Sequence, residues 1–253
     1  MNLANKIVDQ IKLLVQDAAT LTEYRTPLVG FASVQNPLFS KLKNIVGPQH
    51  ILPTEMLSNA QTVISFFIPF HESIVIANKK SSYVAREWCI AYIETNHLIQ
   101  NICEVIIQQL SSDGINGAYQ KATHNFNQED LTAIWSHKSI AYIAGLGSFG
   151  LNNMLITSSG CAGRFGSIVV SALIPPTIRS SENYCLYFKT GKCLYCVNNC
   201  PSGALGIDFL DKKKCYSHLL NIDKQFPTLE LCDACGKCAV GPCAFGAYNA
   251  GQK

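Results

Sequence analysis

Nine of the twelve cysteines fall in the last 69 residues of the chain, and their spacing restricts the fold more than any other feature. One run, C-x2-C-x3-C-P over residues 193–201, is followed by a second run, C-x2-C-x2-C over residues 232–238. Bacterial [4Fe–4S] proteins carry the run C-x2-C-x2-C-x3-C-P, whose fourth cysteine binds the other cluster of a two-cluster ferredoxin. The stretch from Cys185 to Pro201 has this form, except that seven residues instead of two separate Cys185 from Cys193. The spacing therefore predicts two [4Fe–4S] clusters.

Nine cysteines are available for the two sets of four thiolate ligands that such clusters need, so one cysteine is spare. The candidate ligands are Cys185, Cys193, Cys196, Cys200, Cys215, Cys232, Cys235, Cys238 and Cys243. In a ferredoxin-like division, the two sets are Cys185, Cys193, Cys196 and Cys243, and Cys200, Cys232, Cys235 and Cys238, and Cys215 is spare. In a second division, Cys215 joins Cys200, Cys232 and Cys235, while Cys238 completes the first set and Cys243 is spare. The spacing leaves both divisions open.

Two other uses of cysteine fit this pattern less well. A four-cysteine zinc site uses two C-x2-C pairs, whereas this segment has enough cysteines for twice as many ligands. A disulfide framework is typical of small secreted domains. Residues 1–11 instead carry Lys6 and Asp9 in an amphipathic pattern and lack the apolar core of a secretory signal. We therefore expect reduced thiols and a cytoplasmic location.

Composition indicates a folded chain with a sizeable core, because 48% of the residues are hydrophobic and 15% are charged. The formal net charge is +3, but each [4Fe–4S]2+ cluster with four thiolates carries a net charge of about −2, so two of them bring the total to about −1. This charge gives no reason to expect a nucleic-acid partner. No apolar run is long enough to span a bilayer, and we expect no membrane association.

Hydrophobic periodicity predicts a mixed α/β fold before the cysteine runs. Strands are expected at residues 27–34, 62–70, 154–157 and 165–174. Helices are expected at residues 1–20 and 82–110, and from about Asn127 to Gly145, with Gly114 ending the long second helix. We expect Cys89 and Cys103 to be buried as small apolar residues. Pro175-Pro176 marks the expected domain boundary, and Lys212–Lys214 is expected to be a solvated loop.

Two glycine-rich stretches follow the predicted third helix. Residues 144–153 contain three glycines within six positions, which permit close backbone approach to something flat or bulky, but this signal is weak by itself. A second stretch, residues 158–164, is expected to join two strands and contains Cys161. Because Cys161 is isolated from the cysteine runs, we expect it to be a free loop thiol, with a redox or cofactor contact as the minor alternative.

The stretch HK-x5-AGLGSFG at residues 137–150, the strand–turn–strand with Gly163-Arg164 and the two cysteine runs together resemble the epoxyqueuosine reductase and reductive dehalogenase superfamily. More closely, the chain resembles the short stand-alone members. The resemblance implies a corrinoid-binding domain with a nitroreductase-like α/β sandwich at residues 1–178 and a ferredoxin-like domain with two [4Fe–4S] clusters at residues 179–253. It also implies cobalamin as a cofactor, which receives single electrons from the clusters and carries out a reductive step.

The same resemblance implies particular site residues. The implied corrinoid contacts are Gly145, Leu146, Gly147, Gly150 and Arg164. Asp130 and His137 are the candidate catalytic proton donors, with Glu129 and Tyr142 as further candidates. Epoxyqueuosine reductases have an Asp thirteen residues before the AGLG alanine, and Leu131 stands at that position here. The match therefore does not extend to the tRNA-modifying activity.

The expected partners are an electron-donor protein of the ferredoxin or flavodoxin type and a small-molecule or nucleotide-derived substrate. A tRNA partner is not supported by the net charge. Two alternatives remain open at this point. The chain could be an electron carrier without chemistry of its own, or its first domain could bind flavin in place of a corrinoid.

Overall fold

The computed structural model describes residues 2–246 of the chain. Its α-helices are α1 (Leu3–Gln16), α2 (Leu38–Ile45), α3 (Pro53–Met56), α4 (Glu72–Lys80), α5 (Arg86–Ser112), α6 (His137–Ile143), α7 (Leu186–Thr190), α8 (Tyr195–Asn198) and α9 (Lys212–Asp223). Its strands are β1 (Leu28–Ser33), β2 (Thr62–Pro69), β3 (Gly117–Tyr119), β4 (Gly147–Phe149), β5 (Leu155–Thr157) and β6 (Gly163–Val170), and a short 3-10 helix covers Lys237–Ala239.

Four strands form an antiparallel sheet in the order β1-β2-β6-β3, and β4 and β5 form a separate two-stranded sheet. Strand β2 pairs with β6 along its whole length, from Thr62 opposite Val170 to Pro69 opposite Gly163. Every residue of β2 is buried. This burial explains why its sequence is a continuous β-branched and aromatic run, since both faces of the strand lie against packed side chains.

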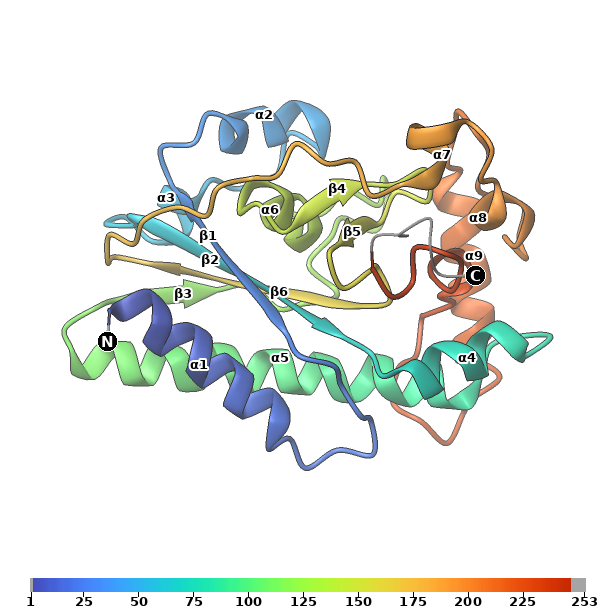
Figure 1. Ribbon diagram of the computed structural model, residues 1–253, viewed down its shortest axis with the longest axis horizontal. Coiled ribbons are helices and arrows are strands. Elements are labelled where there is room, and N and C mark those ends of the chain that lie inside the picture. Colours follow the sequence, from blue (N-terminus) through green and yellow to red (C-terminus); the bar gives the residue numbers. More distant parts are fainter. Residues whose placement is uncertain (1, 247–253) are drawn as a thin grey trace.

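Helices cover both faces of the main sheet (Figure 1). Helices α1 and α5 cover one face, where Ile11 packs in the same cluster as Ile64 and Ile102. Helices α2 and α6 cover the other face, where Phe39 of α2 and Ile140 of α6 share a cluster with Val63 of β2. The predicted mixed α/β fold is confirmed. The nitroreductase-like and ferredoxin-like descriptions, and the boundary after residue 178, stay predictions.

The predicted helix from Asn127 to Gly145 is wrong in its first half, because α6 begins only at His137. The Asn127 side chain accepts a hydrogen bond from the backbone N–H of Glu129 (2.8 Å), and the Asp130 side chain accepts from the backbone N–H of Thr132 (2.9 Å). Such local side-chain bonds compete with helical backbone bonds. Leu131 also has a φ of 55°, which a helix cannot accommodate.

Three smaller expectations also differ from the structure. Strand β5 pairs with β4 instead of β6, and β6 ends at Val170, earlier than expected. The segment Lys212–Lys214 starts helix α9 and is not a loop. It does so because the Asp211 side chain accepts a hydrogen bond from the backbone N–H of Lys214 at 2.9 Å, which caps the helix.

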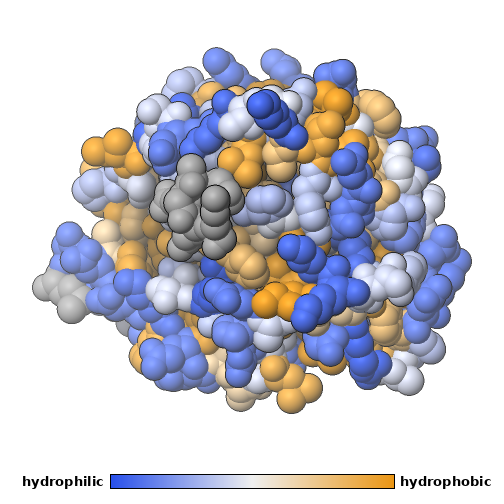
Figure 2. Space-filling view, turned by 45° about the vertical axis from the view of Figure 1, so that its right-hand side comes forward, coloured by the Kyte–Doolittle hydropathy of each residue, from blue (hydrophilic) through white to orange (hydrophobic). Residues whose placement is uncertain are grey.

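The cysteine-rich tail packs against α4 and the first turns of α5, at the right-hand end of Figure 1. One hydrophobic cluster contains Phe70 and Trp88 from the first part of the chain together with Cys232 and Val240 from the tail. Figure 2, in which this end comes forward, shows hydrophobic patches interspersed among hydrophilic residues. Among residues 2–246, no helix combines the length and apolar character needed to cross a bilayer.

Candidate iron–sulfur site and adjoining cavity

Four cysteines from three separate segments meet beside α7 and α8. Cys185, Cys193, Cys196 and Cys243 line one small cavity, whose wall Cys238 also reaches. Burial and the nearby sulfur atoms of Cys243, Cys185 and Cys193 together raise the pKa of the Cys196 thiol to about 11. This first cysteine group therefore joins both ends of the tail.

A second cysteine group comprises Cys200, Cys215, Cys235 and Cys238. Burial raises the pKa of Cys235 to about 11, and the neighbouring sulfur atoms of Cys215 and Cys200 contribute to the increase. Burial also raises the pKa of Cys238, with contributions from Cys235, Cys215 and Cys200 and from Cys196 of the first group. The other three sulfur atoms of each group thus lie within electrostatic reach of one member, Cys196 in the first group and Cys238 in the second.

Cys232 lies beside Cys89, a thiol of α5, and Cys89 is also within electrostatic reach of Cys235 of the second group. Cys232 is fully buried, and the hydrogen bond between the two thiols, together with burial, raises the pKa of Cys89. Both divisions left open by the sequence include Cys232 as a ligand.

Cys161 is a free thiol in the turn between β5 and β6, as its isolated position predicts, but it is not remote from the tail. It is fully buried, and its Sγ lies 3.6 Å from Sγ of Cys243. The Asn152 side-chain amide donates a 2.9 Å hydrogen bond to the backbone carbonyl of Cys238 and approaches Cys161 Sγ at 3.9 Å. Sequence spacing gives no signal for this contact, because 82 positions separate Cys161 from Cys243.

The second cysteine run is fixed to the first part of the chain by specific polar contacts. The Asn78 side-chain amide donates a hydrogen bond to the carbonyl of Cys235 at 2.9 Å. The Lys237 ammonium donates to the carbonyls of Asn78 (2.5 Å) and Ser81 (2.7 Å). Because these acceptors end helix α4, the loop that carries Cys235 and Cys238 is held by a rigid element.

No three His, Cys, Asp or Glu side chains within residues 2–246 converge closely enough to bind a single metal ion. The ligands of a [4Fe–4S] cluster bind four separate irons, so their sulfur atoms lie further apart than the ligands of one ion. Two groups of four thiols, each drawn from distant segments of the tail, fit the donor set of two such clusters.

A cavity of about 440 Å³ lies between the front part of the chain and the tail. Its lining residues come from α2, α6, the segment 131–133, β4 and the start of α9, and include Leu42, Tyr142 and Phe149. Lys138 and Lys212 also line it, and no Asp or Glu does so among the described residues. The cavity is therefore mostly apolar with two cations in its wall.

Lys138 connects this cavity with the second cysteine group. Its ammonium donates a 2.9 Å hydrogen bond to the carbonyl of Asn153, which also lines the cavity. Burial lowers the pKa of Lys138, and the nearby sulfur atoms of Cys238 and Cys215 oppose this change. One side chain thus contacts the cavity and lies near two cysteines of the second group.

The two predicted catalytic residues are placed differently. Asp130 is exposed, and the hydrogen bonds it accepts from Thr132 lower its pKa, so it is ionised near neutral pH. His137 is buried, and its ring nitrogens contact Ser167 Oγ (2.9 Å) and the carbonyl of Lys121 (3.0 Å). Burial lowers the pKa of His137 to about 4. Neither side chain lines the cavity, although Leu131 and Lys138, their neighbours in sequence, do.

The predicted glycine contacts are explained by internal packing. A Cβ on Gly147 would lie 2.1 Å from the carbonyl oxygen of Ile156, and one on Gly150 would lie 2.6 Å from the side chain of the same residue. Gly145 has a φ of +79°, and its Cβ would lie 3.3 Å from Cα of Arg179. These positions therefore need glycine because β4, β5 and residue 179 approach them closely, whatever else contacts the loop.

The remaining two predicted cofactor contacts also point away from the cavity. Leu146 is buried in a cluster with Phe67 and neighbouring residues. The Arg164 guanidinium lies 4.3 Å from the ring centre of Tyr92, whose hydroxyl donates a 2.5 Å hydrogen bond to Asp233. Arg164 thus supports the contact between β6, α5 and the second cysteine run. Phe149 and Asn153, which flank the predicted glycines, line the cavity instead.

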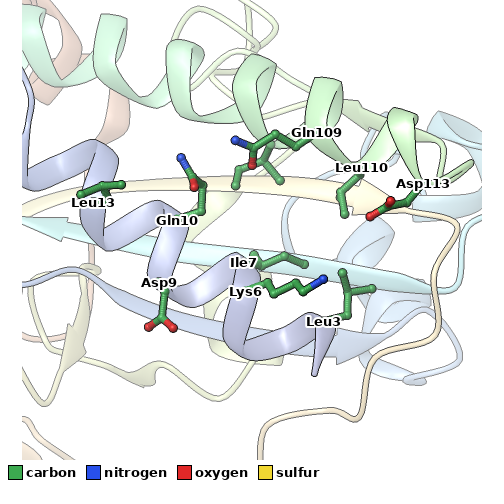
Figure 3. A pocket seen from close by; sticks show the side chains of 10 residues that line it. Leu3, Lys6, Ile7, Asp9, Gln10, Leu13, Gln109, Leu110 and Asp113 are labelled. Atoms are coloured by element: carbon green, nitrogen blue, oxygen red, sulfur yellow. The ribbon is translucent and has the colours of Figure 1, made fainter. Parts of the chain in front are cut away.

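Another hollow of about 400 Å³ lies between α1 and α5 and is lined by Ile7, Gln10 and Gln109, among others (Figure 3). These helices cover the sheet face opposite α2 and α6, so the sheet separates this groove from the 440 Å³ cavity. Because its volume is similar to that of the 440 Å³ cavity, the groove is a suitable control position for substitutions in that cavity.

Proteins of known structure share the fold of this chain. No protein-family model and no curated protein matches the sequence. The epoxyqueuosine reductase from Streptococcus thermophilus is similar, with a TM-score of 0.59 and 17% identity over 95% of this chain and 65% of that chain. An epoxyqueuosine reductase with a tRNA-Tyr epoxyqueuosine-modified tRNA stem loop gives a TM-score of 0.60 and 15% identity, over 94% of this chain and 64% of that chain.

A reductive dehalogenase whose structure suggests a mechanism for B12-dependent dehalogenation is also similar, with a TM-score of 0.57 and 13% identity, over 90% of this chain and 30% of that one. The chain therefore spans less than two thirds of the epoxyqueuosine reductases and about a third of the dehalogenase. The protein has the fold that these two kinds of enzyme share. The resemblance predicted from residues 137–150 and the cysteine runs is confirmed at the level of the fold.

Proposed function

We propose that this protein is a reductase in which two [4Fe–4S] clusters pass single electrons to an acceptor bound in the 440 Å³ cavity. The position of Lys138 carries this proposal, because its side chain lines the cavity and its ammonium lies near Cys238 and Cys215. An electron carrier without its own chemistry would not need an apolar cavity beside its clusters. Enclosed apolar cavities of this size are typical of small-molecule and cofactor sites.

The proposed ligand division follows the two cysteine groups. Cys185, Cys193, Cys196 and Cys243 bind the first cluster, and Cys200, Cys215, Cys235 and Cys238 bind the second. The two sites are adjacent, because Cys238 of the second group also reaches the wall of the first cavity. Electrons would enter at the first cluster, which lies beside α7 and α8, and leave from the second.

Cobalamin is the proposed acceptor, and it would supply a low-potential metal centre for a reductive step. The fit is partial, since a complete cobalamin exceeds 440 Å³ and would extend beyond the enclosed space. The aromatic side chains of Tyr142 and Phe149, whose ring centres are 5.7 Å apart, offer a flat apolar contact. Lys138 and Tyr142 replace Asp130 and His137 as the groups that hold a proton at the cavity.

The substrate is proposed to be a small or nucleotide-derived molecule. Lys138 and Lys212 in the wall favour a substrate or cofactor that carries negative charge. A structural neighbour has been described with a modified tRNA stem loop. Here Leu131 stands where that family has its Asp, so action on tRNA does not follow from this site.

The first test is chemical analysis of protein purified without oxygen, followed by addition of cobalamin. We expect about eight irons and about eight inorganic sulfides per chain for two clusters, and a shift of the cobalamin visible spectrum on binding. Ala133→Trp would fill part of the cavity and should abolish the shift. Gln109→Trp, in the groove of Figure 3, is the matched control and should leave the shift unchanged.

The outcomes separate the alternatives. Full iron content with bound flavin and no cobalamin binding would mean that flavin, and not a corrinoid, is the cofactor. Full iron content with no bound cofactor, and with no effect of Ala133→Trp on any ligand, would favour the electron carrier. Bound zinc without inorganic sulfide would overturn the cluster assignment itself.

A further inference from the structure

The outer side of the first cysteine group carries a positively charged surface. Residues 186–207, which include α7 and α8, contain two lysines, Lys189 and Lys192, and no Asp or Glu. Residues 73–81, which form most of α4, contain Lys79 and Lys80 and likewise no acidic residue. All four lysines are exposed.

Tyr195 links this surface to the first cysteine group. The Lys79 ammonium lies 5.8 Å from the ring centre of Tyr195, which is a cation–π arrangement. The Tyr195 side chain also lines the small cavity shared by Cys193 and Cys196. Lys79 is therefore one aromatic side chain away from this cavity. Cys193 itself follows Lys192 in the chain and is partly exposed.

An exposed aromatic residue completes the surface. Phe188 of α7 is 53% exposed and follows Tyr187, whose ring lies 5.6 Å away. Protein contacts that must form and dissociate quickly combine a small apolar centre with a charged rim, because charge raises the rate of encounter without requiring a large buried area. Lys79 of α4 and Lys189 and Lys192 of residues 186–207, here called the lysine patch, supply the charge, and Phe188 supplies an exposed apolar side chain.

We propose that the lysine patch is the docking surface for an acidic one-electron donor protein. This inference rests on the proposed function, because it places the entry of electrons at the first cluster. In the step itself, the donor loses one electron and a [4Fe–4S]2+ cluster becomes [4Fe–4S]+, with no bond broken and no proton transferred. The patch supplies positive charge that an acidic donor surface complements.

The test uses reduced flavodoxin as an acidic donor and the triple variant Lys79→Glu, Lys189→Glu and Lys192→Glu of the cluster-loaded protein. The second-order rate constant for cluster reduction should fall at least about tenfold at low ionic strength, and its decrease with added salt should disappear. The matched control, Lys6→Glu, Lys12→Glu and Lys41→Glu, changes the net charge equally but at exposed positions of α1 and α2. It should retain the rate within about twofold, since screening limits long-range effects.

Reduction by methyl viologen, a small cationic reductant, separates the failure of this inference from failure of the proposed function. Both triple variants should keep their iron and be reduced by the viologen radical at least as fast as the wild type. If the viologen radical reduces both variants normally, and flavodoxin reduces both variants equally fast, the lysine patch is not the docking surface. If the wild type holds no cluster, the proposed function itself is wrong. A neutral variant with glutamine at all three patch positions should give a smaller decrease than the glutamates.

Discussion

Cys232 and Cys215 differ in what surrounds their sulfur atoms. Cys215 lies near Cys200, which raises its pKa in addition to burial, whereas Cys232 is paired with Cys89. Cys232→Ser should therefore retain about eight irons per chain, and Cys215→Ser should retain about four after anaerobic reconstitution. Iron and sulfide analysis measures both. Loss of a cluster from Cys232→Ser with full iron in Cys215→Ser would restore the ferredoxin-like division.

His137 gives the fold a pH dependence of predictable sign. Its pKa is about 4 in the folded state, against about 6.5 in an unfolded chain. Between these values the unfolded chain binds a proton that the folded protein excludes, so stability falls as the pH decreases from about 6.5 to about 4. From pH 7 to pH 5 the loss due to His137 should be about 2 kcal/mol.

Urea unfolding of wild type and His137→Gln at both pH values tests this prediction. The variant lacks the titrating group, so its free energy of unfolding should change less over this interval by about that amount. Acid effects on the clusters are common to both proteins and cancel in the comparison. An equal pH dependence of the two would mean that His137 is already protonated in the folded state.

At the scale of elements, two glycines with the same backbone conformation differ in their surroundings. Gly236 (φ +70°) begins the short helix after Cys235, and a Cβ there would lie 2.1 Å from the Trp88 ring of α5. Gly191 (φ +71°) ends α7, and nothing lies within 4 Å of its Cβ position. Gly191→Ala should cost about 1 kcal/mol of left-handed strain and keep all iron.

Gly236→Ala should cost a further ~1–3 kcal/mol, because the overlap with Trp88 displaces the loop or the ring. It should also lower the iron content, since Cys235 and Cys238 lie on either side of this glycine. Thermal unfolding and iron analysis of the two variants make the comparison. Similar stability and iron content in both variants would show that the loop does not depend on its contact with α5.

Sequence patterns predicted those elements whose hydrophobic period agrees with their burial. Strand β2 and helix α5 are examples, because burial on both faces and on one face respectively leaves a regular pattern. The segment after Asn127 failed because its side chains bond the local backbone, a competition that periodicity does not report.

The candidate site was predictable only in part, for a similar reason. Cysteine spacing identified all eight proposed ligands, because C-x2-C places two sulfurs together locally. It gave no signal for the contact between Cys232 and Cys89, since 143 positions separate the two residues in the sequence. The cavity joins α2, α6 and the start of α9, and no local pattern reports such an assembly. Lys138 stood in the HK pair, but only its contacts with both cavity and cysteine group give it a role.

At the scale of the whole molecule, two of the hydrophobic clusters are separate from each other. One is shared by α4, the first turns of α5 and the cysteine-rich tail, and the other lies under the main sheet. Trp88 and Phe70, whose rings meet edge to face with centres 5.1 Å apart, belong to the cluster that includes Cys232 and Val240. The main sheet instead packs with α1 and the later turns of α5 in a separate cluster. Loss of iron should therefore loosen one end of the molecule and leave the sheet folded.

Hydrogen exchange measured by mass spectrometry tests this division. After removal of iron by a chelator under reducing conditions, exchange should speed up at least about tenfold in α4, the first two turns of α5 and the tail, because their shared core loses its cross-links. Exchange in β2 and β6 should stay within about twofold of the loaded protein. Reconstitution with iron and sulfide should restore the original pattern. A uniform increase across β2 and β6 would instead mean that the clusters hold the whole chain together, because the two cores would then unfold as one cooperative unit.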